Sequence, residues 1–226
     1  SLPLWDPVRQ FPAIPLFDGW FQSPKLLHYP VLISQVLLLL AIILVKRASK
    51  VLSLVYIALF VLLVLEDQTR WQVYYYHYLF MLLIAAWGNN PKAQLTALRI
   101  IMVGIYLYAG AHKLNTYFIN GVFPSFIETF TPLPEKWLTT PLRYVALIIP
   151  LAEVAIAMAL LSTRWRKLAL LGIWLTHGFA LMVLGPWGQG HGLQVWPWNL
   201  AMIAFSVLLF YTTDNFSLDA ISARWK

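Results

Sequence analysis

Seven long apolar segments dominate this 226-residue sequence and constrain its fold more than any other feature. They cover residues 26–45, 51–65, 71–87, 95–111, 142–161, 168–184 and 195–212. A helix needs roughly 17 to 25 apolar residues to cross the hydrocarbon core of a bilayer, and several segments are closer to 17 than to 20 residues. They lack the strict alternation of transmembrane barrel strands, and backbone groups in lipid must be paired internally. The sequence therefore predicts an all-α integral membrane protein.

The number of transmembrane helices predicted is about seven. The second segment is the shortest, and we expect it either to be a tilted span or to form part of a tight hairpin with its neighbour. The count is therefore six to seven, and the helices should form a single bundle.

Composition supports this class and excludes others. Hydrophobic residues make up 60% of the chain and charged residues 11%, whereas a soluble domain carries roughly 25% charged residues. The net charge of +7 comes from short basic runs between apolar segments, where such residues set membrane orientation and bind anionic headgroups. A nucleic-acid partner is therefore not expected. The absence of cysteine excludes disulfides, thiolate metal sites and iron–sulfur clusters formed by this chain.

The distribution of lysine and arginine predicts the orientation. If the N-terminus lies outside and the spans alternate, ten of the sixteen basic residues fall on the inner side, including the clusters at 46–50 and 164–167. Positive charge favours the inner side of a membrane. We therefore expect an N-out, C-in arrangement.

Three regions follow from this topology. Residues 1–25 form a Pro- and aromatic-rich N-terminal arm, residues 26–213 the membrane domain, and residues 214–226 a polar inner tail. The longest connection, residues 115–141, lies outside and is expected to contain a short interfacial helix around residues 123–130. Residues 185–192, GPWGQGHG, should form a Gly-rich turn on the same side.

Polar side chains within or beside the segments are the candidate functional residues, because such groups are costly to place in a bilayer. The candidates for ligand binding or catalysis are Asp67, Arg70, Gln72, His77, His112, Lys113, Glu153 and His177. Asp67, Arg70, Lys113, His112 and His191 share the predicted outer interface. They either converge on a cavity that binds a polar head or a quinone-like ring, or they form ion pairs that pin the helix ends while Lys113 extends to water.

Glu153 and His177 lie deeper in the predicted bundle. Glu153 either pairs with His177, or stays protonated and hydrogen-bonds across helices. His77 lies within a run of tyrosines, which favours a packed polar contact over a ligand. The histidines show no i, i+4 spacing, and inside the spans no carboxylate stands at helical spacing from one of them, so no metal site is predicted.

Two stretches carry a family resemblance. Residues 99–123, RIIMVGIYLYAGAHKLNTYFINGVF, resemble the core motif of the HTTM (horizontally transferred transmembrane) and DoxX-like superfamily. Residues 67–83, DQTRWQVYYYHYLFMLL, are similar to a second motif of that group. The resemblance covers roughly residues 55–211, most of the membrane part. It implies a small multi-pass protein of a bacterial inner membrane.

The resemblance also implies roles for two residues. The superfamily includes the membrane domain of vitamin K-dependent gamma-glutamyl carboxylase, where the lysine of an AG-x-x-K-L stretch is implicated as the base that deprotonates a hydroquinone. The matching position here is Lys113, with His112 next to it to assist. DoxX-type relatives are associated with quinone-linked oxidation or with partner redox proteins. The chain lacks residues for the carboxylase's large extramembrane domain, so the fold and a quinone-like site carry over and carboxylation does not.

The sequence is compatible with three functions. It does not indicate whether the protein is an enzyme. The first is a site for a quinone or a lipid head near Lys113, Arg70 and Asp67, with quinone as the implied cofactor. The second is a non-catalytic accessory or structural subunit, whose partners would be other subunits of a redox, photosynthetic or respiratory membrane complex. A transporter is less favoured because the sequence shows neither an inverted repeat nor paired broken helices.

Overall fold

The structure, a computed structural model, describes residues 12–18, 24–88, 90–132, 141–190, 195–211 and 216. Every regular element in these ranges is helical, as the sequence predicts. Four helices are long and apolar enough to cross a membrane: Lys46–Glu66, Pro91–Lys113, Arg143–Leu160 and Arg166–Leu184. Three shorter apolar helices span His28–Leu44, Val73–Trp87 and Trp196–Phe210. The helical character is confirmed, and four helices have the length and composition of membrane spans. Seven spans and their orientation stay predictions.

The second helix corrects one expectation. The segment predicted to be the shortest forms α2 (Ser49–Glu66), which has 18 residues and follows a 3-10 turn at Lys46–Ala48. The helices α1 (His28–Leu44) and α3 (Val73–Trp87) are shorter, with 17 and 15 residues. The apolar run underestimated α2 because the helix also includes polar residues at its ends, namely Ser49, Lys50 and Glu66.

The helix α4 (Pro91–Lys113) also extends beyond its apolar segment, because its first residues carry a capping signal. The side chain of Asn90 accepts hydrogen bonds from the backbone N–H groups of Lys92 at 3.0 Å and Ala93 at 3.3 Å. Pro91 occupies the first helical position, where its missing N–H costs nothing. An N-cap of this kind stabilises a helix by about 1 kcal/mol, so α4 starts four residues before the apolar run.

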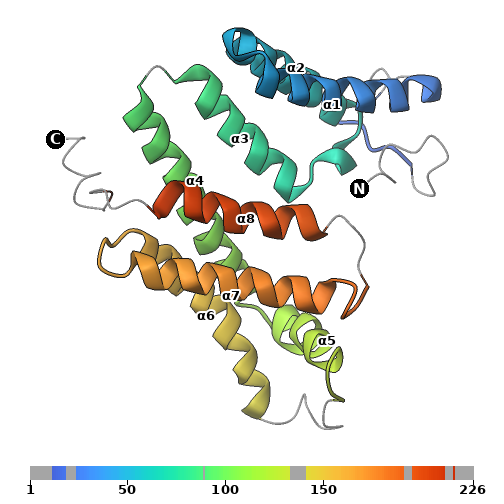
Figure 1. The fold of residues 1–226 in the computed structure, drawn as a ribbon. Coiled ribbons are helices and arrows are strands. Elements are labelled where there is room, and N and C mark those ends of the chain that lie inside the picture. Colours follow the sequence, from blue (N-terminus) through green and yellow to red (C-terminus); the bar gives the residue numbers. More distant parts are fainter. Residues whose placement is uncertain are drawn as a thin grey trace. The chain divides into compact units, whose positions relative to one another are not determined.

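The chain divides into two compact units, residues 1–94 and residues 95–226, and the boundary falls in the first turns of α4. In the first unit α2 packs against both α1 and α3 (Figure 1). Its core contains Tyr56, Phe60 and Leu79, and the rings of Phe60 and Tyr75 lie 4.9 Å apart. The first unit is thus a three-helix assembly built around α2.

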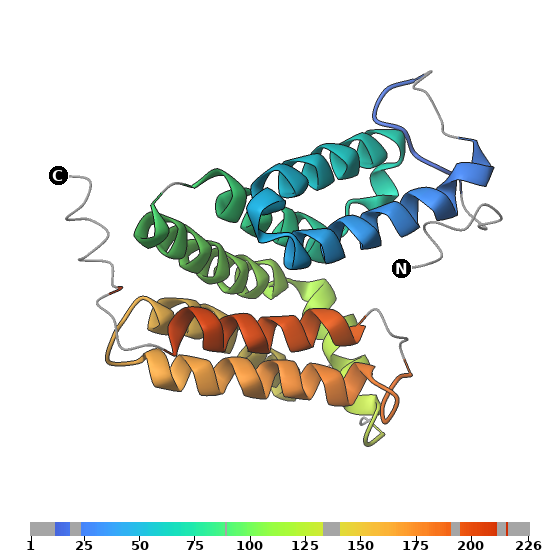
Figure 2. The same cartoon turned by 45° about the horizontal axis from the view of Figure 1, so that its top comes forward.

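The second unit contains the remainder of α4 with α5 (Phe123–Glu128), α6 (Ile148–Leu160), α7 (Arg166–Leu184) and α8 (Val195–Phe210). The helix α7 packs against α6 and α8, and Figure 2 shows α7 and α8 side by side along their lengths. The indole N–H of Trp174 in α7 donates to the hydroxyl of Ser206 in α8 at 3.2 Å. The central helix of this unit is therefore α7.

The predicted interfacial helix corresponds to a π-helical turn at Phe118–Val122 that continues into α5. Asn115 connects this element to α4: its amide nitrogen donates to the carbonyl of His112 at 2.6 Å, and its amide oxygen accepts from the N–H of Phe118 at 2.8 Å. The predicted Gly-rich turn is described as far as Gly190, whose φ of 67° favours glycine. His191 and the polar tail, apart from Phe216, lie outside the described residues.

Candidate functional site

The sequence-predicted site residues divide between the two units. Asp67, Arg70, Gln72 and His77 belong to the first unit, and His112, Lys113, Glu153 and His177 belong to the second. Each group is described within its own unit.

Glu66, Asp67 and Arg70 form a buried polar cluster, here called the α2–α3 corner, with exposed fractions of 7%, 0% and 2%. A guanidinium nitrogen of Arg70 donates to Glu66 at 2.8 Å, and its Nε lies 3.7 Å from the carboxylate of Asp67. The Oδ1 atom of Asp67 accepts from the N–H and the hydroxyl of Thr69, at 3.2 and 2.8 Å, and from the N–H of Ile14 at 3.2 Å. These contacts close the corner and attach the N-terminal segment to it.

The other two candidates in the first unit are also held by local contacts. The side chain of Gln72 donates to the carbonyl of Thr69 at 2.7 Å, at the start of α3. His77 is 1% exposed, and its ring stacks on Tyr78 with 5.5 Å between ring centroids. Gln72 and His77 thus both contact residues at most three positions away in the sequence.

Lys113 and Glu153 form an ion pair between α4 and α6, here called the α4–α6 pair. The ammonium nitrogen of Lys113 lies 2.8 Å from Oε1 and 2.6 Å from Oε2 of Glu153, so it donates to both carboxylate oxygens. The carboxylate is nearly buried, with 8% of its side chain exposed, whereas the Lys113 side chain is 29% exposed. Glu153 thus pairs with Lys113 in this structure, and not with His177 as one of the sequence-based alternatives held.

Gly110 explains how the pair can form. A Cβ atom at this position would lie 2.6 Å from the backbone oxygen of Pro150 and 2.8 Å from the Cγ2 atom of Val154 in α6. The absence of a side chain therefore lets α4 and α6 approach closely, one turn from Lys113 and beside Glu153. This close approach brings the carboxylate of Glu153 within hydrogen-bonding distance of Lys113.

Tyr106, His177 and Asn199 form a second hydrogen-bonded group, here called the buried triad. The hydroxyl of Tyr106 in α4 lies 2.7 Å from Nε2 of His177 in α7, and Nδ1 of His177 lies 2.7 Å from the amide oxygen of Asn199 in α8. Their exposed fractions are 2%, 8% and 6%. Side-chain hydrogen bonds between helices are one of the main ways in which membrane helices associate, and here they join three helices.

The α4–α6 pair and the buried triad are neighbours. Tyr106 and Lys113 are seven residues apart in α4, so both project from the same helix face. Seven residues correspond to about two helical turns, so the pair and the triad follow one another along one side of α4. The second unit therefore contains one polar cluster drawn from four helices, with a partly exposed lysine at its edge.

His112 does not take part in this cluster. Its side chain is exposed, and its ring stacks on Tyr108 of the preceding turn with 5.7 Å between centroids. Consecutive residues of a helix project about 100° apart, which separates His112 from Lys113. In the part of the chain that the structure describes, no three His, Asp or Glu side chains are arranged to hold a metal ion.

Sequence reasoning missed Tyr106, Gly110 and Asn199 as site residues. Two signals were available: Tyr106 stands at helical spacing from Lys113, and Asn199 is an amide inside an otherwise apolar segment. Nothing in the sequence indicates which partner each would meet, because that depends on how the helices are rotated against one another.

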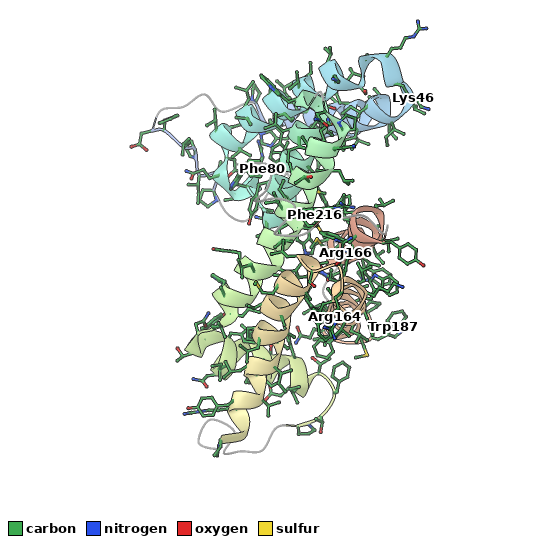
Figure 3. All side chains as sticks on the ribbon, turned by 90° about the vertical axis from the view of Figure 1, so that its left-hand side faces the viewer. Lys46, Phe80, Arg164, Arg166, Trp187 and Phe216 are labelled. Carbon is green, nitrogen blue, oxygen red and sulfur yellow. The ribbon has the colours of Figure 1, made fainter. Side chains whose placement is uncertain are left out.

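A third polar cluster lies at the other end of α4. Arg99 and Arg166 are 2% and 4% exposed, although neither is among the sequence-predicted site residues. Their guanidinium carbons lie 5.1 and 5.9 Å from the ring centre of Phe216. Arg166, which Figure 3 labels close to Phe216, also donates to the carbonyl of Phe216. Such cation–π contacts stabilise desolvated arginines, so these residues hold Phe216 in place.

Comparison of the chain with protein-family models, with curated proteins and with solved structures found no match. The resemblance to the HTTM and DoxX-like superfamily stays a prediction, and the functional argument rests on the geometry of the second unit.

Proposed function

We propose that this protein is a multi-pass membrane protein of HTTM/DoxX-like type that binds the polar head of a quinone or a lipid beside the α4–α6 pair. In this proposal all seven apolar helices cross the membrane, the N-terminus is outside, and the site opens on the outer face. The observation that supports it is the ion pair between partly exposed Lys113 and nearly buried Glu153, which lies next to the buried triad.

Helix packing alone does not explain the ion pair between Lys113 and Glu153. Ionisable groups in a membrane helix are costly and usually mark a ligand or ion site. Lys113 belongs to the last turn of α4, where it could stabilise the helix dipole and extend to water without a partner. Glu153 is instead placed within α6, where a leucine would pack at no electrostatic cost. The protein therefore retains a carboxylate that packing does not require.

The pair offers complementary chemistry to a head group. An ammonium group donates hydrogen bonds and attracts carbonyl or phosphate oxygens, whereas a carboxylate accepts hydrogen bonds from hydroxyls. Exposure of Lys113 lets a ligand approach, and burial of Glu153 strengthens each contact made there. These features suit either a quinone ring or a lipid head.

The test is retention of an extractable ligand. The protein is purified in mild detergent with Lys113→Met and, as a matched control, Lys92→Met at the opposite end of the same helix. Organic extracts are compared for quinones and lipids by mass spectrometry. We expect about a tenfold or greater loss of one compound in Lys113→Met, equivalent to the loss of a charged contact, and no loss in Lys92→Met.

A double variant that exchanges the two charges distinguishes a role of the pair in ligand binding from a role in stabilising the protein. Lys113→Glu combined with Glu153→Lys restores an ion pair between α4 and α6 but reverses the two positions. We expect this double variant to regain thermal stability relative to either single variant and still to lack the ligand. Recovery of both properties would reduce the pair to a helix–helix contact.

The accessory-subunit alternative predicts other outcomes. The protein would then be extracted only within a larger assembly, and no compound would depend on Lys113. Absence of any retained quinone or lipid in the wild-type protein, together with a stable stoichiometric complex, would replace the proposed function by that alternative.

A further inference from the structure

We propose that Glu153 makes the site at the α4–α6 pair select an uncharged head group over an anionic one. This inference rests on the proposed function, because it concerns the ligand of that same site. Glu153 is then the residue that sets specificity, and Lys113 is the residue that contacts the ligand.

The hydrogen-bond donors of Lys113 are almost fully used within the protein. An ammonium group has three N–H donors. The nitrogen of Lys113 lies 2.8 and 2.6 Å from the two carboxylate oxygens of Glu153, and 3.4 Å from the backbone oxygen of Ala109. The contact with Ala109 is longer than the usual upper limit of about 3.2 Å. A ligand oxygen can therefore replace Ala109 and accept one hydrogen bond from Lys113 without breaking the ion pair.

The carboxylate of Glu153 determines which charge such a ligand can carry. Both of its oxygens lie next to the ammonium nitrogen, so the pair as a whole has no net charge. Only 8% of the Glu153 side chain is exposed, and burial weakens the screening of its negative charge by water. A phosphate that approached Lys113 would meet this like charge, which costs binding energy, whereas a carbonyl or ether oxygen would not. The pair therefore favours a neutral hydrogen-bond acceptor.

The other cations of the same helical segments lie too far away to offset this repulsion. In the described part of the second unit up to the end of α6, the other permanent cations are Arg99 and Arg143. Arg99 precedes Lys113 by 14 residues and Arg143 precedes Glu153 by ten, which correspond to about 21 and 15 Å of helical backbone. Lys113 is therefore the cation that a head group meets here, and its charge is already balanced.

Anionic head groups have a better site at the start of α7. Arg164 and Lys167 are exposed there, and the guanidinium of Arg164 lies 5.2 Å from the ring centre of Trp165. None of the described residues after Glu153 is acidic, so no carboxylate in that part of the structure balances these charges. The second unit thus keeps its unbalanced exposed cations away from the α4–α6 pair, and we expect anionic lipids at Arg164 and Lys167.

The experiment follows Lys113 itself in the full-length protein. The protein is placed in nanodiscs of phosphatidylcholine with its lysines labelled at the ε-carbon, and the NMR signal of Lys113 is assigned with Lys113→Arg, which keeps the cation. The probes are a decyl-substituted benzoquinone, dioctanoylglycerol and dioctanoyl phosphatidylglycerol. The first two are neutral and represent a quinone and a lipid as sources of the head group, and the third is anionic.

The expected result in the wild type is a clear order of affinities. At least one neutral probe should shift the Lys113 signal in a saturable way, and the anionic probe should bind there about tenfold or more weakly. Comparison of the two neutral probes identifies the source of the head group. The signal of Lys167 should respond more strongly to the anionic probe, which shows that this probe reaches the protein.

Glu153→Gln tests the role assigned to Glu153. Glutamine keeps the size of the side chain and an oxygen that can accept from Lys113, but the charge that opposes an anion is gone. The anionic probe should then bind at Lys113 about tenfold or more tightly than in the wild type. Glu128→Gln, which removes an exposed carboxylate of α5, is the matched control and should keep the wild-type order.

The possible failures differ from one another. If the anionic probe binds at Lys113 of the wild type as tightly as the better neutral probe, the selectivity is wrong and head-group binding at the pair stands. The same conclusion follows if Glu153→Gln leaves the order of the probes unchanged. If no probe shifts the Lys113 signal, the selectivity and the proposed function both fail. The wild-type measurement decides even where Glu153→Gln does not fold.

Discussion

The α2–α3 corner of the first unit and the polar cluster of the second unit use similar residues in different ways. In the corner, Arg70 bonds to Glu66 four residues away, and Asp67 accepts from Thr69 two residues away. In the second unit the partners are 40 residues apart for Lys113 and Glu153, and 71 apart for Tyr106 and His177. The corner therefore closes a local turn and also holds Ile14 of the N-terminal segment, whereas the cluster of the second unit consists of contacts between helices.

This difference decides which residues are candidates for function. A local ion pair forms as soon as its turn forms, and it stabilises that turn. A long-range pair with one exposed partner gains little for the local backbone, and it presents a charge where a ligand can reach it. The comparison predicts that substitutions in the corner affect stability and that substitutions at Lys113 affect binding.

The largest expected effect is that of Arg70→Met. This substitution removes the guanidinium that faces the buried carboxylates of Glu66 and Asp67, and breaking a buried pair in this way costs about 3–5 kcal/mol. Thermal unfolding in detergent should show a large loss of stability, with retention of any bound ligand by the fraction that stays folded.

The matched control for Arg70→Met is Arg47→Met, because Arg47 is an exposed arginine of the same unit. Its effect should stay within about 0.5 kcal/mol, as for most surface substitutions. A stable Arg70→Met protein that has lost its ligand would reverse the comparison and move the functional site to the corner.

A smaller effect is expected from Gly110→Ala. The added Cβ would lie 2.6 Å from a backbone oxygen of α6, and overpacking of this kind costs about 1–3 kcal/mol. Separation of α4 from α6 should also weaken the contact between Lys113 and Glu153. The measurement is thermal stability combined with ligand retention.

Gly104 provides the contrast within the same helix. No atom lies within 4 Å of the position that its Cβ would take, so Gly104→Ala should stabilise α4 by up to about 1 kcal/mol through helix propensity. If both substitutions had the same sign, close packing at Gly110 would not be what brings the pair together.

The smallest effect is expected from His112→Ala. The side chain is exposed and contacts the ring of Tyr108, so its removal should change stability by no more than about 0.5 kcal/mol. Because the ring lies apart from Lys113 and Glu153, ligand retention should also be unchanged. Loss of the ligand in this variant would extend the site to His112, in the role that the family resemblance gave it.

Much of the fold could be predicted from the sequence, because each apolar run must form a helix once its backbone is placed in lipid. The residues at which the helices end were harder to predict. Lys50 and Glu66 belong to α2 although hydropathy assigned them to loops, since charged side chains at a helix end can extend to water. Asn90 before Pro91 was a capping signal that a count of apolar residues does not register.

The candidate site was only partly predictable. Glu153 and His177 stood out as costly polar residues in apolar segments, and Lys113 as a charge beside the end of one. The structure draws all three into one cluster. Tyr106 was overlooked because tyrosine is common in membrane helices and does not signal a buried hydrogen bond by itself. Its role depends on His177, which is 71 residues away in the chain.

The sequence by itself determined that this chain forms apolar helices and where they lie along the chain. It also determined which polar residues are costly to place within or beside those helices. These properties depend on local composition and on the backbone's need for internal hydrogen bonds. Only the tertiary structure decided that Glu153 meets Lys113 and that His177 meets Tyr106 and Asn199. Such pairings depend on helix rotation and on close approaches such as that at Gly110, which no single segment specifies.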